Sequence, residues 1–190
     1  MVSPLRIFTA LLLLLATASA GPSYHYRLDG AASQVSARVS YFGLGHKTVR
    51  FPVMRGSIRL TPDRLDAIDL EVDLDARAMT AGSQTDTDYL KGKAFFDVAN
   101  YPNLRFAGQR MIMTGSVTAR VEGMITARGV TRPAVLAVSF ADPPARASGR
   151  APIALAATTT INRRDFGMTS YALVVGKNVT ITIQARLVPD

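Results

Sequence analysis

The sequence predicts an all-β fold in which eight or nine short antiparallel strands form a sandwich or a barrel. The first observation is an alternation of apolar and polar residues with a period of two, which is typical of strands with one buried face. It is clearest over residues 68–75, where Ile68 and every second residue after it are apolar and the residues between are acidic. The second is that clusters of Gly, Pro, Asn and Asp separate such segments at close spacing, as turns do. Many short strands with turns between them favour packed or closed sheets.

Each expected strand lies between turn residues such as Asp29-Gly30 or Asp142-Pro143-Pro144. Besides 68–75, the alternation is regular over residues 35–41, 117–122 and 178–187. Further strands are expected at residues 24–28, 57–61, 103–107, 134–140 and 153–161. Only residues 83–96 lack the alternation. We expect one short helical segment there, at about residues 87–91, with Asp86 or Thr87 as its N-cap.

Residues 1–20 have the pattern of a secretory signal peptide. One arginine precedes an apolar run that contains five consecutive leucines, and Ala18-Ser19-Ala20 matches an A-x-A cleavage site. The apolar run is shorter than the ~20 residues that span a bilayer. We therefore expect cleavage near Ala20 and one domain over residues 21–190, in the periplasm or secreted.

The charge and the cysteine count exclude several classes of function. The sequence contains no cysteine, so neither a disulfide nor a thiol nucleophile is available. Without the first twenty residues, 21 basic residues stand against 14 acidic ones. This net positive charge attracts anionic surfaces, among them phospholipid headgroups. The basic residues are scattered, and Arg163-Arg164 is the only adjacent pair. A continuous basic stripe, which is typical of nucleic-acid-binding proteins, is therefore not expected.

The sequence lacks the motifs of the common enzyme classes. It contains no G-x-S-x-G, P-loop or H-E-x-x-H pattern, and no G-x-G-x-x-G after a strand. His25 and His46 are not at metal-ligand spacing. Asp86 and Asp88 stand two residues apart in the irregular segment, where they form either a carboxylate pair for acid-base or cation chemistry or part of a helix start. We expect no catalytic residues, no metal and no cofactor.

Three segments carry recognisable motifs. Residues 90–102 read L-K-G-K-A-F-F-D-V-A-N-Y-P, residues 123–133 read G-M-I-T-A-R-G-V-T-R-P and residues 161–167 read I-N-R-R-D-F-G. In order and spacing they resemble the motifs of the YceI-like family. That resemblance implies an antiparallel eight-stranded lipocalin-like β-barrel that is exported and binds polyisoprenoids or other long-chain lipids. The amino-terminal third departs from the family pattern, with Tyr41 in place of a usual histidine and Val49 in place of a usual glycine.

The expected ligand site is the interior of this barrel. A polyisoprenoid or fatty chain has no hydrogen-bonding groups, so its carrier needs a dry tunnel with at most one polar mouth. The alanines expected to face inward either leave space for such a chain or pack against large neighbours; they are Ala37, Ala119, Ala127 and Ala185. The residues expected to wall the tunnel are Tyr41, Phe51, Phe95, Phe96, Tyr101, Phe106, Val121, Phe140 and Phe166.

The candidates for the polar end of the ligand site are Asn162, Arg163 and Asp165. In the alternative interpretation, Arg163 and Asp165 pair with each other or with Asp97, and so hold the irregular segment on the barrel.

The leading hypothesis is a periplasmic binding or carrier protein for a polyisoprenoid or other long-chain lipid, without catalysis. Its expected partners are that lipid and, transiently, a membrane surface or a membrane protein, and not nucleic acid. One alternative is an enzyme of isoprenoid lipid or quinone metabolism that uses Asp86, Asp88 or Tyr41 for proton transfer. The other is a filled barrel that acts by docking to a membrane protein.

Overall fold

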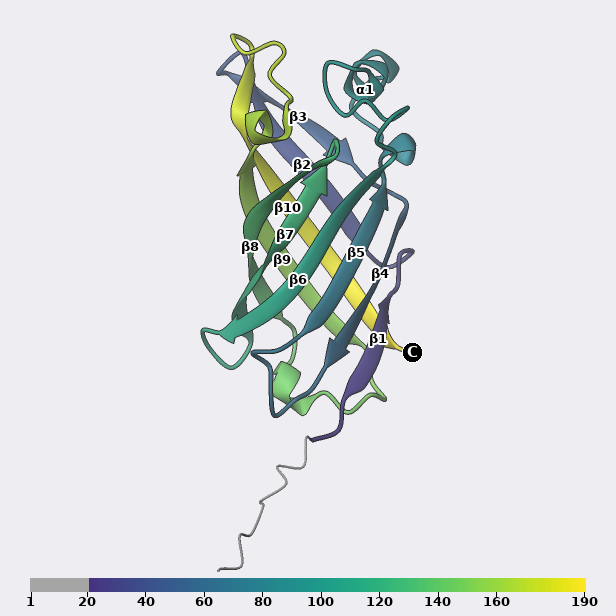
Figure 1. The fold of residues 1–190 in the computed structure, drawn as a ribbon, viewed down its shortest axis with the longest axis vertical. Helices are drawn as coiled ribbons and strands as arrows, with labels where there is room; N and C mark the ends of the chain where they lie inside the picture. The colour runs from purple at the N-terminus through teal and green to yellow at the C-terminus, as the bar shows by residue number, and fades with distance from the viewer. Residues whose placement is uncertain (1–20) are drawn as a thin grey trace, which may run out of the picture.

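Ten strands surround one interior in the computed structural model, which describes residues 21–190 (Figure 1). The expected signal peptide, residues 1–20, lies outside the described residues. The strands are β1 (Tyr24–Leu28), β2 (Gln34–Tyr41), β3 (Gly45–Arg50), β4 (Met54–Leu60), β5 (Asp69–Asp75), β6 (Asn103–Met113), β7 (Thr118–Ala127), β8 (Val130–Phe140), β9 (Ile153–Asn162) and β10 (Val175–Pro189). The connections contain helix α1 (Gln84–Lys91) and the 3-10 helices η1 (Ala76–Ala78), η2 (Pro144–Arg146) and η3 (Arg163–Phe166).

The sheet closes on itself because the ten strands occupy eight positions around the barrel. The antiparallel order is β1-β4-β5-β6-β7-β8-β9-β10, and β1 pairs again with β10. Strand β10 is long enough to pair with β2 as far as Gln184 and with β1 from Leu187 onward. Therefore β1 and β2 share one position, and β4 and β3, which pair with them, share the next. The predicted eight-stranded antiparallel barrel is confirmed, and a sandwich is excluded.

Strand β3 is the element that the sequence does not predict. Most of its residues are polar, and Val49 is its single buried residue, so its alternation is weak. It forms because the chain reverses after β2 and pairs back along it, from Tyr41 with Gly45 to Ser36 with Arg50. The backbone of Phe42 and Gly43 makes this reversal at positive φ, 50° and 70°.

Helix α1 begins earlier than expected, at Gln84, and its N-cap is Ser83. The Ser83 Oγ accepts a hydrogen bond from the backbone N–H of Asp86 at 3.1 Å, which satisfies one of the free donors of the first turn. The prediction of Asp86 or Thr87 as the cap is therefore wrong. Asp86 lies in the first turn, where a carboxylate interacts favourably with the helix dipole.

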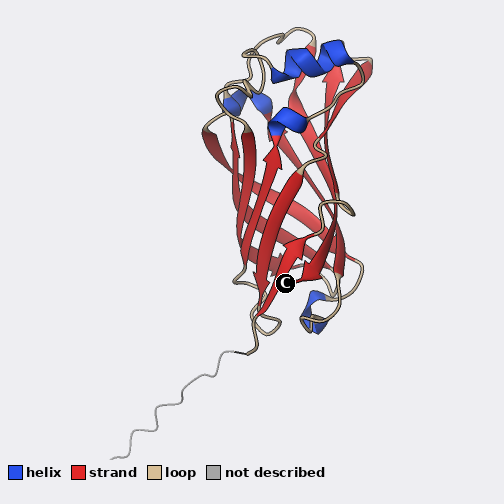
Figure 2. Ribbon diagram, turned by 90° about the vertical axis from the view of Figure 1, so that its right-hand side faces the viewer, coloured by secondary structure: helices blue, strands red, loops and turns tan. Residues whose placement is uncertain are grey.

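The helices mark two unlike ends of the barrel (Figure 2). Helix α1, η1, η3 and the β2–β3 turn lie at one end, here called the α1 end, and η2 lies at the other, the η2 end. At the η2 end, Leu65 and Ala147 from the connecting loops pack against a buried cluster that includes Leu60 and Met111 and so cover the barrel. The hydroxyl of buried Tyr26 accepts a hydrogen bond from the Gly149 N–H at 3.0 Å, which holds the connection after η2 against the barrel.

Candidate ligand-binding site

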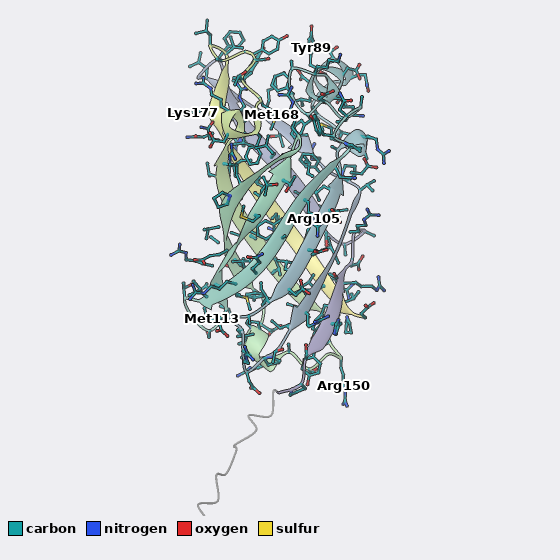
Figure 3. The ribbon with its side chains drawn as sticks, viewed as in Figure 1. Tyr89, Arg105, Met113, Arg150, Met168 and Lys177 are labelled. Carbon is teal, nitrogen blue, oxygen red and sulfur yellow. The ribbon has the colours of Figure 1, made fainter. Side chains whose placement is uncertain are left out.

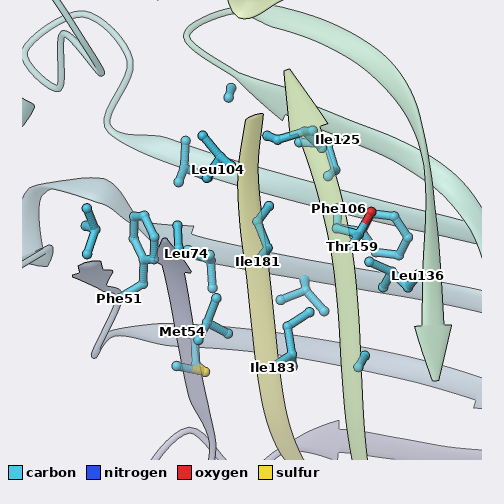
Figure 4. Close-up of a pocket in the computed structure, with 18 of the residues that line it drawn as sticks. Phe51, Met54, Leu74, Leu104, Phe106, Ile125, Leu136, Thr159, Ile181 and Ile183 are labelled. Carbon is cyan, nitrogen blue, oxygen red and sulfur yellow. The ribbon is translucent and has the colours of Figure 1, made fainter. Parts of the chain in front are cut away.

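A cavity of about 520 Å³ occupies the barrel between the covered η2 end and the α1 end. This volume falls within the roughly 300–1,000 Å³ that is typical of small-molecule sites. Its wall is mostly apolar, because the inward member of each alternating pair is aliphatic or aromatic. Figure 4 shows side chains that converge on it from several strands, among them Met54, Leu74, Phe106, Ile125, Leu136, Ile181 and Ile183.

Strand β5 illustrates how the sequence makes a dry interior. Leu70, Val72 and Leu74 line the cavity, whereas Glu71 and Asp73 form ion pairs with arginines on the outer surface. Exposed ion pairs stabilise a fold little. A shift of one residue in the pairing of β5 would bury its acidic side chains, so the alternation fixes the register of this wall.

Small residues create part of the space. Ala37, Ala127 and Ala185 line the cavity, as the sequence predicts for alanines that leave room. Ala119 instead packs in the buried cluster at the η2 end. Ala157 is a further small residue on the cavity wall. Of the four alanines expected to face inward, three line the cavity and Ala119 packs against larger neighbours.

Seven of the nine residues predicted to wall the tunnel line the cavity: Tyr41, Phe51, Phe95, Phe96, Phe106, Val121 and Phe140. The rings of Phe51 and Phe96 meet edge to face, with centroids 6.1 Å apart. The other two lie elsewhere. Phe166 is buried in a cluster with Ala127 and Met168, and Tyr101 packs its ring against Gly129 in the β7–β8 turn.

Arg163 is the one polar-end candidate that lines the cavity, and it is only 3% exposed. Its guanidinium donates to the backbone carbonyls of Val175 and Gly176, each at 2.9 Å, and to that of Met168. These bonds attach the connection between η3 and β10 to the barrel. Burial, with a smaller effect from neighbouring Arg164, lowers the pKa of the Arg163 guanidinium.

The ion pair expected between Arg163 and Asp165 or Asp97 does not form among the residues that the structure describes. The guanidinium is used by backbone carbonyls, which the sequence pattern does not reveal. Asp165 instead accepts from the Asn162 amide at 3.1 Å, and both residues line a shallow depression on the outer face of β8 and β9. Asp97 accepts from the amide of Asn100. The hydrogen bonds of Arg163 thus hold the connection between η3 and β10, and not the irregular segment at residues 83–96.

The cavity reaches the surface at the α1 end. Tyr89 and Tyr171 line it and are 58% and 50% exposed. Tyr171 stacks on Phe95 with ring centroids 5.6 Å apart and meets Tyr89 edge to face at 6.4 Å. We call Tyr41, Lys47, Asp86, Tyr89 and Tyr171, which all line the cavity at this end, the mouth residues.

An ion pair crosses the mouth from β3 to α1. The Lys47 Nζ lies 2.7 Å from the Asp86 carboxylate and 5.0 Å from the centroid of the Tyr41 ring. The hydrogen bond raises the pKa of Lys47 and lowers that of Asp86. Sequence reasoning does not identify Lys47, because its partner is 39 residues away and lies in a different element.

The carboxylates of the irregular segment are therefore not arranged as a pair. Asp86 is engaged by Lys47, and Asp88 accepts from the Gln84 amide at 2.8 Å. Within residues 21–190, no three His, Asp or Glu side chains gather as a metal site would require. Over the same residues, no helix has the length and apolar character needed to cross a bilayer.

Comparison with known proteins places this architecture in a family. Residues 26–187 match the YceI-like domain. A Pseudomonas putida relative named UPF0312 protein is 28% identical over 167 residues, which cover 86% of this chain and 87% of the relative. Among solved structures, Burkholderia cenocepacia BcnA has a TM-score of 0.74 at 20% identity, covering 84% of this chain and 98% of that one. A polyisoprenoid binding domain from Saccharophagus degradans has a TM-score of 0.64 at 16% identity, covering 87% and 98%. The chain therefore belongs to the YceI-like family, as its three sequence motifs predict.

Proposed function

We propose that this protein binds a polyisoprenoid or another long-chain lipid inside its barrel, and that it carries or sequesters this lipid in the periplasm without catalysis. The observation that carries the proposal is the apolar cavity of about 520 Å³ that runs from the covered η2 end to the mouth residues. The Saccharophagus degradans domain of the same fold is described as polyisoprenoid binding, which supports the same class of ligand.

The wall suits a hydrocarbon chain better than a polar metabolite. Burying a chain in such a wall contributes about 0.8 kcal/mol per methylene, because each one leaves water for an apolar surface. Of the four charged residues that contribute to the wall, Lys47, Asp86 and Arg163 lie at its α1 end. Arg105 also contributes to the wall, from β6, but its guanidinium pairs with exposed Glu71. A lipid with one polar end fits this arrangement, because its hydrocarbon chain would lie against the apolar wall and its polar end would lie beside the charged residues at the mouth.

The mouth chemistry favours binding over proton transfer. A general base must accept a proton near the working pH, and the ion pair with Lys47 lowers the pKa of Asp86 away from that range. Asp88 accepts a hydrogen bond on the helix surface and is not among the residues that line the cavity. Tyr41 packs beside Lys47 and offers an aromatic face to the ligand.

A periplasmic location is proposed from the pattern of residues 1–20, which is that of a secretory signal peptide. Amino-terminal sequencing of the protein isolated from the periplasm should give Gly21 as the first residue. A mature protein that still begins at Met1 in the cytoplasm would contradict this part of the proposal.

The direct test is solvent extraction of the purified protein followed by mass spectrometry of the extract. Val121→Trp places a large ring inside the cavity, because Val121 is 3% exposed and lines it. Val135→Trp is the matched control: Val135 is 40% exposed and lies on β8, next to Leu136, which pairs with Val121. Ala37→Phe fills the cavity from β2 if Val121→Trp does not fold.

The wild-type protein and the Val135→Trp variant should yield a long-chain lipid, and a folded cavity variant should lose most of it. Far-UV circular dichroism checks the fold. A lipid-free extract from wild type would overturn the proposal, as would undiminished lipid in both cavity variants. A chemically altered lipid would support the enzyme alternative.

A further inference from the structure

Five large apolar side chains stand exposed around the mouth of the cavity. They are Phe42 (62% exposed), Leu44 (98%), Tyr89 (58%), Tyr171 (50%) and Leu173 (100%), here called the rim residues. The other exposed large apolar residues between residues 21 and 190 belong to other segments: Val53 (53%), Tyr101 (38%) and Val135 (40%). Scattered exposed apolar residues are ordinary, whereas a cluster marks an interaction surface.

The rim residues form one surface although they come from three separate segments. Phe42 and Leu44 lie in the β2–β3 turn, Tyr89 on α1, and Tyr171 and Leu173 between η3 and β10. The Phe42 N–H donates to the Val174 carbonyl at 2.8 Å, and the Tyr171 ring meets that of Tyr89. Figure 3 shows Tyr89 at this end of the molecule. Because Tyr89 and Tyr171 also line the cavity, the surface continues into the apolar interior.

Two of the rim residues adopt an uncommon backbone conformation. Phe42 and Tyr171 have φ of 50° and 56°, in the left-handed region that aromatic residues rarely occupy. Strain of this kind persists where the surrounding structure requires it and is frequent at functional sites. A polar residue or a glycine would satisfy both turns more easily, so the sequence retains exposed rings at two positions where they are unfavourable in the free protein.

The charges around the rim favour an anionic partner. Lys47, Lys91, Lys93, Arg164 and Lys177 lie in the elements of the α1 end, and Figure 3 shows Lys177 there. Residues 42–50, 76–102 and 163–177, which form this end, carry eight lysines and arginines against four aspartates. The loops of the η2 end differ, because residues 61–68 and 141–152 carry three arginines and three aspartates. Apolar tips flanked by lysines match a membrane surface with anionic lipids.

We propose that the rim docks on the surface of a lipid bilayer that contains anionic headgroups, with Phe42, Leu44 and Leu173 inserted among the headgroups. The cavity mouth would then face the bilayer, and a chain would pass between the membrane and the cavity without crossing water. This inference deepens the proposed lipid-carrier function and rests on it for its purpose. The docking itself depends only on the rim residues and on the basic residues around them.

The test is co-sedimentation of the full mature chain with vesicles of phosphatidylcholine and phosphatidylglycerol. Leu44→Ser with Leu173→Ser removes two rim side chains that do not line the cavity. The matched control is Val53→Ser with Val135→Ser, which removes two exposed apolar side chains outside the rim. The rim variant should bind vesicles roughly tenfold or more weakly, and the control should bind as wild type does. Wild-type binding should weaken severalfold in added salt, because salt screens the attraction between the lysines and the anionic headgroups. It should weaken similarly on vesicles of phosphatidylcholine alone, because these lack anionic headgroups.

Equal binding by the rim variant and the control would overturn the docking proposal. So would wild-type binding to native membranes but not to protein-free vesicles, which would indicate a membrane protein as the partner. Lipid loading from ethanol solution, without vesicles, separates the two proposals. The rim variant should load as wild type does. If the wild-type protein loads lipid but does not bind vesicles, the docking proposal is contradicted and the carrier function is supported. If it binds vesicles but does not load lipid, the carrier function is contradicted and the docking proposal is supported.

Discussion

The ammonium group of Lys47 lies 2.7 Å from the carboxylate of Asp86, and this pair joins strand β3 to helix α1 across the cavity mouth. Both elements also carry rim residues or adjoin them, so the pair links two sides of the opening. Both side chains remain partly exposed to water, which screens the attraction. The pair is therefore expected to act on the local order of α1 more than on global stability.

The pH dependence of this local order follows from the two pKa shifts. The pKa of Asp86 is lowered on folding, so its contribution is complete above the unfolded pKa of about 4 and is lost as the pH falls through the folded value. The pKa of Lys47 is raised, so its contribution is complete below about 10.4 and is lost as the pH rises through the folded value. Amide hydrogen exchange in α1, corrected for intrinsic rates, should quicken below about pH 4 relative to exchange in β10. Lys47→Met should show the faster exchange already at neutral pH, and normal α1 protection in that variant would contradict the assignment.

Replacement of Arg163 should be costly because its guanidinium satisfies three backbone carbonyls in a buried place. Arg163→Met should lower the free energy of unfolding by about 2–5 kcal/mol, measured by urea denaturation, and should expose residues 168–176 to proteolysis. Arg163→Lys should recover little, because a single ammonium cannot reach all three acceptors. Arg164→Met, at the exposed neighbouring position, is the control and should change stability by less than about 0.5 kcal/mol. A stable Arg163→Met variant with an intact loop would show that these hydrogen bonds are dispensable.

The Phe106 ring, which lines the cavity, packs over Gly123 and leaves no room for a side chain there. A Cβ on Gly123 would lie 2.3 Å from the Ala107 carbonyl oxygen and 2.7 Å from the Phe106 ring. Gly123→Ala should therefore destabilise the barrel by about 1–3 kcal/mol through overpacking. Gly82→Ala, where no atom lies within 4 Å, should be neutral or slightly stabilising. Thermal unfolding of the two variants makes the comparison, and equal melting temperatures would argue against this packing.

The sequence predicts well those features that depend on alternation along one strand. Strand β5 is the clearest case, because Leu70, Val72 and Leu74 line the cavity as a period of two requires. Strand β3 is missed because its pairing with β2, and not its own composition, makes it a strand. The Lys47–Asp86 pair and the carbonyl partners of Arg163 join residues from different elements, so no local pattern reports them. Tyr101 and Phe166 carry family motifs yet lie off the cavity wall, because a motif fixes residue types and the fold decides where they point.

The central claim, that the barrel interior binds a hydrocarbon chain, is tested most directly by isothermal titration of the lipid-free protein with alcohols of increasing chain length and the same headgroup. If the chain lies in the cavity, each added methylene should strengthen binding by up to about 0.8 kcal/mol, or roughly fourfold in Kd, until the cavity of about 520 Å³ is full. Beyond that length the affinity should level off. In the Val121→Trp variant, which has a smaller cavity, the affinity should level off at a shorter chain length. An affinity that does not depend on chain length would contradict the account.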